Sequence, residues 1–139
     1  MNYSLPIRVY FEDTDAAGVV YHSNYLKFME RARSQWFIDQ GMGMMSLMQT
    51  HSAVFVVSEV ELRLRDSAKL EDLLDVTVRL QGLKKVSAVF DQEVFRDGQL
   101  ICRGTVKVGC VHAISMKPVR IPADVSAALS SLDTRPLTP

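Results

Sequence analysis

The sequence lacks an excess of charge of either sign: Lys and Arg total 16, Asp and Glu total 16, and the formal net charge is zero. A general electrostatic attraction to nucleic acid is therefore not expected, although a local basic patch is compatible with this balance. The sequence also lacks an apolar run that could span a bilayer. Its beginning, MNYSLPIRVYFEDTD, has neither the basic start nor the apolar core of a signal peptide. We therefore expect a cytoplasmic protein that has no transmembrane segment and binds no nucleic acid.

Cysteine is scarce, and Cys102 and Cys110 are the two examples in the chain. Both lie in a stretch whose pattern predicts one continuous β-strand, which would separate them by roughly 26 Å. That distance is far beyond the reach of a disulfide bond. We therefore expect two reduced cysteines within a sheet, as is usual for a cytosolic protein.

The length and composition suit one globular domain. The chain has 139 residues, of which 47% are hydrophobic and 23% charged, a profile typical of folded proteins. Such a chain can bury a substantial core but is too short for two ordinary domains. We place a single domain at residues 1–133 and expect residues 134–139 to form a flexible tail.

A helical period is clear between residues 24 and 40. The apolar side chains recur at spacings of three and four, at Tyr25, Phe28, Met29, Ala32 and Trp36. Ser23 or Asn24 is a suitable N-cap for this helix. The Met-rich segment that follows, residues 42–50, is compatible with a loose helical turn, a flexible wall over a pocket or adaptable core filling.

A period of two replaces the helical one farther along the chain. It predicts strands at residues 53–65, 74–80, 86–95 and 101–112, and a short apolar run predicts a first strand at residues 7–11. Asp97-Gly98 indicates a tight hairpin between the last two strands. Pro122 then opens a short helical pattern with Val125, Leu129 and Leu132 on one side.

The order of these elements predicts the fold. Strands joined by short connections pair antiparallel, and the long helix needs a sheet to cover its broad apolar face. The compact solution is an α+β hotdog fold, in which an antiparallel β-sheet wraps around one long central α-helix. A ferredoxin-like domain would need a second long helix between the strands, and the pattern shows none.

The segment before the long helix carries the candidate chemistry. Asp15 lies in a loop that leads through Gly18 to His22 and the start of the helix. The first N–H groups of a helix lack internal acceptors and carry partial positive charge. A carboxylate held there could face a carbonyl whose oxygen points at those N–H groups, as acyl transfer requires. On the residues alone, a turn-forming role for Asp15 is the more common outcome, and no metal motif is matched.

This segment resembles the 4-hydroxybenzoyl-CoA thioesterase family of hotdog proteins, and it is most similar to the branch that includes the Tol-Pal-associated acyl-CoA thioesterases. The shared pattern is an Asp, then Gly-Val, Tyr-His, a Tyr that opens the helix, and Glu-Arg-Ala-Arg. Here these positions are Asp15, Gly18, Val19, Tyr21, His22, Tyr25, Glu30, Arg31, Ala32 and Arg33. A weaker likeness covers nearly the whole chain. One departure is Asp66-Ser67, where relatives often carry an Ala-Pro type of turn.

The resemblance implies an enzyme that hydrolyses short- to medium-chain, or aromatic, acyl-CoA thioesters without a cofactor or a metal ion. Asp15 corresponds to the catalytic carboxylate, which either attacks the thioester carbonyl or activates a water molecule. The backbone N–H of His22 would polarise the thioester oxygen, and the His22 side chain is carried over as a catalytic or substrate-orienting group. Gly18, Val19 and Tyr21 would help to orient the substrate.

The resemblance also implies a CoA site and an oligomer. Lys84, Lys85 and Ser87 match positions at which relatives place basic and hydroxyl residues near CoA, although a solvated charged turn explains them equally well. Hotdog proteins of this kind pair their sheets edge to edge and form the site between subunits. We therefore expect a homodimer or homotetramer, which would also cover the exposed edges of a single sheet.

Several assignments stay open at this point. Phe28, Met29, Met44, Met45 and Phe55 are candidates for an acyl-binding wall, although such residues are more often simply core. Glu30 and Arg33 are by default a surface or subunit-contact ion pair. A hotdog dehydratase or isomerase is one alternative, but such enzymes lack this Asp motif. The other is a non-catalytic hotdog protein that binds an acyl thioester or an acyl-carrier protein in lipid or envelope metabolism.

Overall fold

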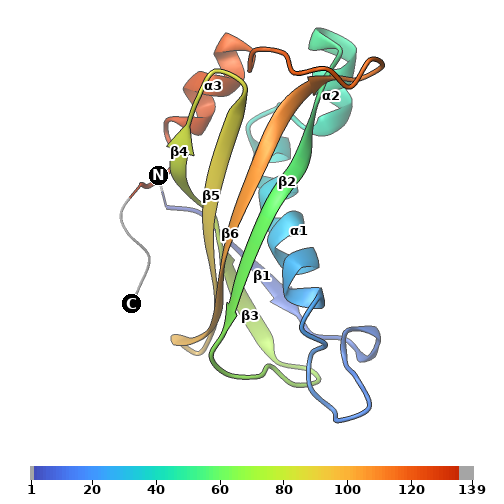
Figure 1. Ribbon diagram of the computed structural model, residues 1–139. Coiled ribbons are helices and arrows are strands. Elements are labelled where there is room, and N and C mark those ends of the chain that lie inside the picture. Colours follow the sequence, from blue (N-terminus) through green and yellow to red (C-terminus); the bar gives the residue numbers. More distant parts are fainter. Residues whose placement is uncertain (1, 135–139) are drawn as a thin grey trace.

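The computed structural model describes residues 2–134, and Figure 1 shows how their helices and strands are arranged. The strands are β1 (Ser4–Arg8), β2 (Ala53–Leu64), β3 (Leu73–Thr77), β4 (Arg79–Leu83), β5 (Ser87–Arg96) and β6 (Gln99–His112). The helices are the short 3₁₀-helix η1 (Phe11–Asp13), α1 (Asn24–Asp39), α2 (Met44–His51) and α3 (Ala123–Leu129). The predicted tail falls almost entirely outside the described residues.

The strands form one antiparallel sheet in the order β1-β3-β5-β6-β2. β3 pairs with the C-terminal part of β5, and β4 pairs with its N-terminal part. The sheet curls around α1, which contacts β1, β3 and β6 (Figure 1). β2 lies at one edge of the sheet. The side of β2 that faces away from β6 pairs with no other strand among the described residues. This arrangement confirms the predicted hotdog fold, an antiparallel sheet around one long central helix.

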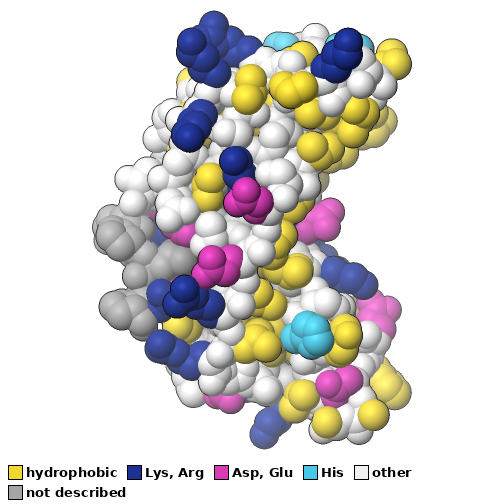
Figure 2. Space-filling view, in the orientation of Figure 1, with side chains coloured by type: hydrophobic (Ala, Val, Ile, Leu, Met, Phe, Trp, Pro, Cys, Tyr) yellow, Lys and Arg dark blue, Asp and Glu magenta, His cyan; other side chains and the backbone are white. Residues whose placement is uncertain are grey.

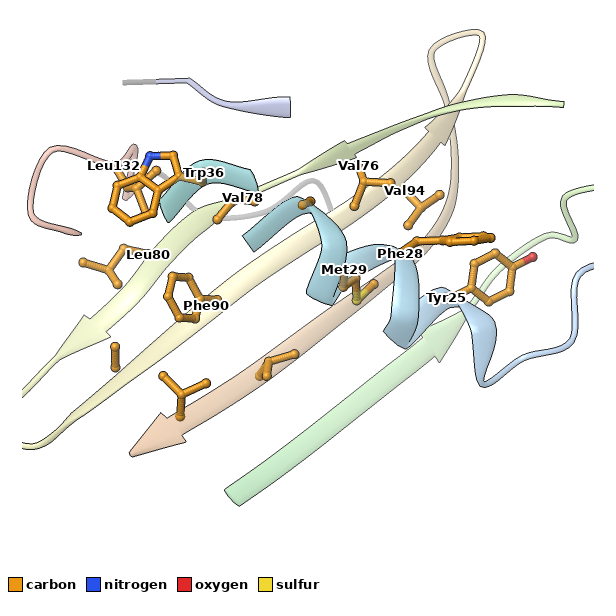
Figure 3. Packing of buried hydrophobic residues seen from close by; sticks show 14 of the residues in the cluster. Tyr25, Phe28, Met29, Trp36, Val76, Val78, Leu80, Phe90, Val94 and Leu132 are labelled. Atoms are coloured by element: carbon orange, nitrogen blue, oxygen red, sulfur yellow. The ribbon is translucent and has the colours of Figure 1, made fainter. Parts of the chain in front are cut away.

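The face of α1 that its period predicted is the face that packs into the core. Tyr25, Phe28, Met29, Ala32 and Trp36 are all buried. In Figure 3 the labelled side chains of α1 lie opposite those of β3, β4 and β5. Each large apolar side chain buried in this way contributes roughly 1.5–3 kcal/mol to folding, so this face holds the helix against the sheet.

Helix α1 packs tightly against β6 at Gly104, a buried residue in the middle of the strand. A Cβ atom at this position would lie 2.6 Å from Sδ and 2.9 Å from Cε of Met29. Both distances are shorter than carbon and sulfur atoms tolerate, so the hydrogen side chain of Gly104 makes room for Met29. The close packing of helix and sheet therefore depends on a glycine in a strand interior.

The predicted strand at residues 74–80 is wrong in one respect, because the structure divides it into β3 and β4. β3 pairs with β1 and β5, whereas β4 pairs with β5 alone. Between them, the N–H of Val78 donates a hydrogen bond to the carbonyl of Tyr3. Leu74, Val76, Val78 and Leu80 are all buried, so the alternation of apolar residues runs through the break. Periodicity therefore cannot reveal that the chain changes its pairing partner here.

One other boundary differs from the prediction, and one segment that the sequence left open is defined by the structure. The first strand covers Ser4–Arg8 rather than residues 7–11, and Phe11 begins η1 with its side chain exposed. The carboxylate of Asp13 accepts a hydrogen bond from the N–H of Tyr10, which favours this tight turn over a continued strand. The Met-rich segment forms a regular helix, α2, of which Leu47 is the buried residue.

Three further predictions about single elements agree with the structure. Cys102 and Cys110 are both free and buried, and burial raises the pKa of the Cys102 thiol to about 12. Helix α3 buries Val125 and Leu129, as its pattern predicted. Asp97 and Gly98 both have positive φ angles, as a tight hairpin of this type requires. Within residues 2–134 no helix is both long enough and apolar enough to cross a membrane.

Candidate active site

Asp15 lies at the start of a small hairpin that precedes α1. Its carbonyl accepts a hydrogen bond from the N–H of Gly18 at 3.0 Å, and its own N–H donates to the carbonyl of Val19 at 2.8 Å. Thr14 and Val20 form a β-bridge just outside this turn. Gly18 has φ +80°, a left-handed conformation that glycine adopts without strain. This conformation of Gly18 gives the loop a defined shape.

The carboxylate of Asp15 helps to build this turn and is still available for chemistry. Oδ1 accepts a hydrogen bond of 2.8 Å from the N–H of Ala17, which is the turn-forming role that the residue type favours. The side chain is exposed. Among the described residues Oδ2 has no hydrogen-bond partner. One oxygen therefore orients the carboxylate while the other faces solvent.

Asp13 connects the hairpin to the start of α1. Its carbonyl accepts hydrogen bonds from the N–H of Tyr21 at 3.0 Å and from Nδ2 of Asn24 at 2.8 Å. Its carboxylate is occupied by the N–H of Tyr10. Asn24 is buried, so its amide contact with Asp13 is shielded from water. Asp13 thus holds the loop in position rather than facing solvent with a free carboxylate.

The start of α1 leaves backbone donors available beside this loop. Ser23, one of the two predicted candidates, is the N-cap residue, but its side chain makes no capping hydrogen bond. Within residues 2–134 the N–H groups of His22 and Ser23 have no hydrogen-bond acceptor. The helix dipole adds partial positive charge at this end. Such an end can stabilise negative charge that develops on a bound oxygen atom.

The rings of Tyr21 and His22 lie against each other in front of this helix end. Their centroids are 4.4 Å apart, and both side chains are exposed. No side-chain hydrogen bond of His22 occurs among the described residues, so its imidazole is free to contact a ligand. The structure thus brings Gly18, Val19, Tyr21 and His22 onto one segment with Asp15.

A second segment, residues 66–72, supports the hairpin. Ala68 accepts a hydrogen bond from the N–H of Val20 at 2.9 Å, and Lys69 forms a β-bridge with Val19. Asp72 holds this segment: its Oδ2 accepts from the N–H of Lys69 at 2.8 Å and from Nη1 of Arg96 at 2.9 Å. Burial raises the pKa of Asp72, but these hydrogen bonds outweigh it and hold the pKa below its usual value.

The departure at Asp66-Ser67 has a structural explanation. Oδ1 of Asp66 accepts a hydrogen bond from the N–H of Ser67 at 2.7 Å. Its Oδ2 lies 3.3 Å from Nη2 of Arg96 and accepts a hydrogen bond of 3.0 Å from Gln99. Asp66 therefore forms the turn with its side chain and attaches it to the β5–β6 hairpin. Nothing in the sequence alone indicated this link.

The three candidate CoA residues lie at the other end of the chain's fold from Asp15. Lys84 and Lys85 are exposed in the turn between β4 and β5, and Ser87 begins β5. Arg96, which contacts residues 66–72, ends β5. A strand of this length spans roughly 30 Å. Within one chain the fold therefore does not bring Lys84, Lys85 or Ser87 together with Asp15.

A cavity of about 420 Å³ opens between α1, α2 and the sheet. Its walls are mostly apolar and include Met44, Met45 and Phe55, three of the residues expected to form an acyl-binding wall. The other two, Phe28 and Met29, are fully buried in the core instead. Figure 2 shows hydrophobic side chains along the hollowed side of the molecule, over α2 and β2.

Sequence reasoning missed the polar group in this cavity. Arg33 lines it and is 8% exposed, so a surface ion pair with Glu30 is wrong, whereas a subunit contact by these residues stays a prediction. Nη1 of Arg33 donates a hydrogen bond of 2.7 Å to Oε1 of Gln92, which is fully buried on β5. The only signal in the sequence was the position of Arg33 one residue after Ala32, at the border of the apolar face. No group of three or more His, Cys, Asp or Glu side chains within residues 2–134 could hold a metal ion.

This chain is similar to known proteins in sequence and in fold. The sequence model of the thioesterase-like superfamily matches residues 9–129. The chain is 40% identical over 130 residues to the acyl-CoA thioesterase YbgC of Haemophilus influenzae, covering 94% of this chain and 96% of the relative. It is 36% identical over 123 residues to the acyl-CoA thioester hydrolase YbgC of Escherichia coli O6:H1, covering 88% and 91%. A crystal structure of a 1,4-dihydroxy-2-naphthoyl-CoA thioesterase from Synechocystis, 20% identical, shares the fold with a TM-score of 0.87 over 95% of this chain and 98% of its own.

Proposed function

Because this chain belongs to the thioesterase-like superfamily and is an acyl-CoA thioesterase, we propose that it hydrolyses short- to medium-chain, or aromatic, acyl-CoA esters with Asp15 as the reacting carboxylate. Water adds to the acyl carbon, the carbon–sulfur bond breaks, and the products are a free acid and CoA. The enzyme would act in the cytoplasm and would need no cofactor or metal ion.

One observation carries the assignment of Asp15. A solvent-facing carboxylate oxygen precedes a helix start whose N–H groups, at His22 and Ser23, have no acceptor among the described residues. A thioester placed between them would present its carbon to Asp15 and its oxygen to the backbone donors. Oδ2 would then either attack the carbon, forming a mixed anhydride that water opens, or remove a proton from an attacking water. In both routes the hydroxyl group of the water joins the acyl carbon, and a proton from the water ends on the CoA sulfur.

The His22 side chain and the Tyr21 ring would flank the bound thioester. Both are exposed beside the free donors and lie against each other. Gly18 adopts a left-handed conformation and has open space around it, so a ligand can approach the backbone closely. Val19 would keep the hairpin attached to residues 66–72 through its bridge to Lys69.

The complete site would need two protomers. β2 is an edge strand, and its side chains Val57, Val60 and Leu64 are about half exposed (52%, 46% and 54%). If β2 pairs antiparallel with β2 of a second copy, a twofold axis places opposite ends of the two sheets side by side. Asp15 of one protomer would then face the end that carries Lys84, Lys85 and Ser87 in the other, where CoA phosphates could bind.

Thiol release tests this proposal directly. Purified wild type and Asp15→Asn are compared on a panel of aliphatic acyl-CoA esters of increasing length and one aromatic ester. We expect the wild type to hydrolyse short- to medium-chain esters and Asp15→Asn to lose at least ~10²-fold in kcat/KM, because the neutral amide is neither nucleophile nor base. Glu12→Gln, which neutralises an exposed carboxylate in the same loop, should retain activity.

Other results would contradict the proposal. Equal turnover by folded Asp15→Asn would exclude Asp15 as the reacting carboxylate. If no CoA ester is hydrolysed but acyl groups on an acyl-carrier protein are, the substrate is an acyl-carrier-protein thioester rather than an acyl-CoA. Binding without turnover on either carrier would favour the non-catalytic hotdog partner instead.

A further inference from the structure

Arg33 is a buried cation with most of its donors unused. A guanidinium carries five N–H donors, and among the described residues Arg33 donates one hydrogen bond, to Oε1 of Gln92. Its side chain lines the cavity between α1, α2 and the sheet. Burial lowers the pKa of Arg33 to about 10, and the negative charge of Glu30 acts in the opposite direction. Arg33 therefore stays protonated near neutral pH.

Support of Gln92 does not by itself explain a cation at this position. Nε2 of Gln92 donates to the carbonyls of Met29 at 3.0 Å and Thr77 at 3.2 Å, and its Oε1 accepts one hydrogen bond, from Arg33. A neutral donor could supply that one hydrogen bond without the desolvation that a buried charge suffers. The unused N–H groups of Arg33 indicate that it also donates to a second acceptor. Because Arg33 lines the cavity, a ligand bound in the cavity could supply this acceptor.

The other residues that line the cavity indicate which class of ligand would carry this acceptor. Phe37, Phe55, Phe90 and Val108 line it, so its walls suit a hydrocarbon or aromatic chain. Its charged lining residues among those described are Arg33 and Glu30, and Glu30 is exposed whereas Arg33 is buried. A ligand that fits would be apolar along its length and would carry an oxygen at its buried end.

We propose that Arg33 is a specificity residue, and that the cavity receives acyl groups whose far end carries a hydrogen-bond-accepting oxygen, either a carboxylate or a hydroxyl. The inference rests on the proposed thioesterase function, which supplies the thioester end of the same substrate. A carboxylate would form a charge-assisted, two-pronged contact with the guanidinium. A hydroxyl would accept a single hydrogen bond and would avoid repulsion by Glu30.

The test compares three CoA esters that share one chain length: hexanoyl-CoA, ω-hydroxyhexanoyl-CoA and adipyl-CoA. The readout is the ratio of kcat/KM for each oxygen-bearing ester to that for hexanoyl-CoA. We expect a ratio of ~10 or more in the wild type for at least one of the two, and a ratio near one in Arg33→Met. Arg31→Met removes an exposed guanidinium two positions earlier on α1 and should leave the ratio unchanged.

The ratio separates recognition from damage to the fold. A structural role for Arg33 would lower all three rates together and leave the ratio constant in Arg33→Met, which would overturn the proposal. A wild type that prefers hexanoyl-CoA would overturn it without any variant. Arg33→Lys keeps the charge but not the planar fork, so it should retain part of a preference for adipyl-CoA. A preference that only ω-hydroxyhexanoyl-CoA shows would identify the hydroxyl as the acceptor.

A binding measurement keeps this test independent of catalysis. Titration calorimetry of the three esters with Asp15→Asn, with and without Arg33→Met, reports affinity even if no ester is hydrolysed. Failure of every ester to turn over would contradict the proposed function, while the affinity ratio would still decide the role of Arg33. Tighter binding of an oxygen-bearing ester, by ~10-fold and lost in the double variant, supports the proposal; equal affinities overturn it.

Discussion

The hydroxyl oxygen of Tyr25 accepts a hydrogen bond of 2.9 Å from the backbone N–H of Ala68, 43 positions away in the chain. Both residues are buried. The contact joins the first turn of α1 to the segment on which the Asp15 hairpin rests, since Ala68 also accepts from the N–H of Val20. Burial raises the pKa of Tyr25, so the phenol stays neutral.

Tyr25→Phe should therefore destabilise the protein and disturb the site. The change leaves the Ala68 N–H buried without an acceptor, at a cost of about 1–3 kcal/mol. Urea denaturation followed by circular dichroism measures this loss, and thiol release should fall because the hairpin loses part of its support. Tyr21→Phe, which alters an exposed phenol, should leave the free energy of unfolding unchanged. A Tyr25→Phe protein as stable as wild type would show that this hydrogen bond contributes nothing net.

Gly104→Ala should lower stability through crowding of Met29. The added methyl group would lie 2.6 Å from Sδ, so the buried Met29 side chain must move, at a cost of about 1–3 kcal/mol. Shortening the neighbour relieves the clash, so Gly104→Ala should cost less in a Met29→Val background. Gly109→Ala on the same strand meets only Val86 O at 4.0 Å and should be nearly neutral. Additive losses in the double variant would rule out the steric explanation.

The Asp72–Arg96 pair should contribute stability that depends on pH. The folded-state pKa of Asp72 is lower than its unfolded value, so its contribution is present above the unfolded pKa of about 4 and is lost as pH falls through the folded pKa. Arg96→Met should cost ~1 kcal/mol at pH 7 and progressively less as pH falls below the unfolded pKa of about 4. Urea midpoints at several pH values report the difference, and a difference that is constant with pH would contradict this account.

The edge strand β2 should mediate assembly. We expect the wild type to be a dimer or tetramer by analytical ultracentrifugation, because Val57 and Val60 would otherwise leave apolar surface in water. The double change Val57→Lys with Val60→Lys should give a folded monomer with little thioesterase activity, since the proposed site spans two protomers. Ile114→Lys, at a loop residue that is 87% exposed, should keep the wild-type mass. A fully active monomer would place the whole site within one chain.

The sequence by itself determined the features that depend on neighbouring residues. The helical period of Tyr25 to Trp36 identified the buried face of α1, because side chains three and four apart share a side of any α-helix. Asp97-Gly98 indicated a tight hairpin with left-handed backbone, since such turns favour these residue types wherever they occur. The placement of Asp15 just before a helix start is likewise a local property.

The tertiary structure decided what depends on residues far apart in the chain. The break between β3 and β4 at Val78 is a change of pairing partner, which leaves the alternation of buried residues intact. Arg33 is buried and donates a hydrogen bond to Gln92 on β5, and no spacing within α1 encodes that contact. Lys84 and Asp15 lie at opposite ends of one sheet because the path of the strands sets their separation. Burial and distance result from packing the whole chain, whereas periodicity and turn chemistry act over a few residues.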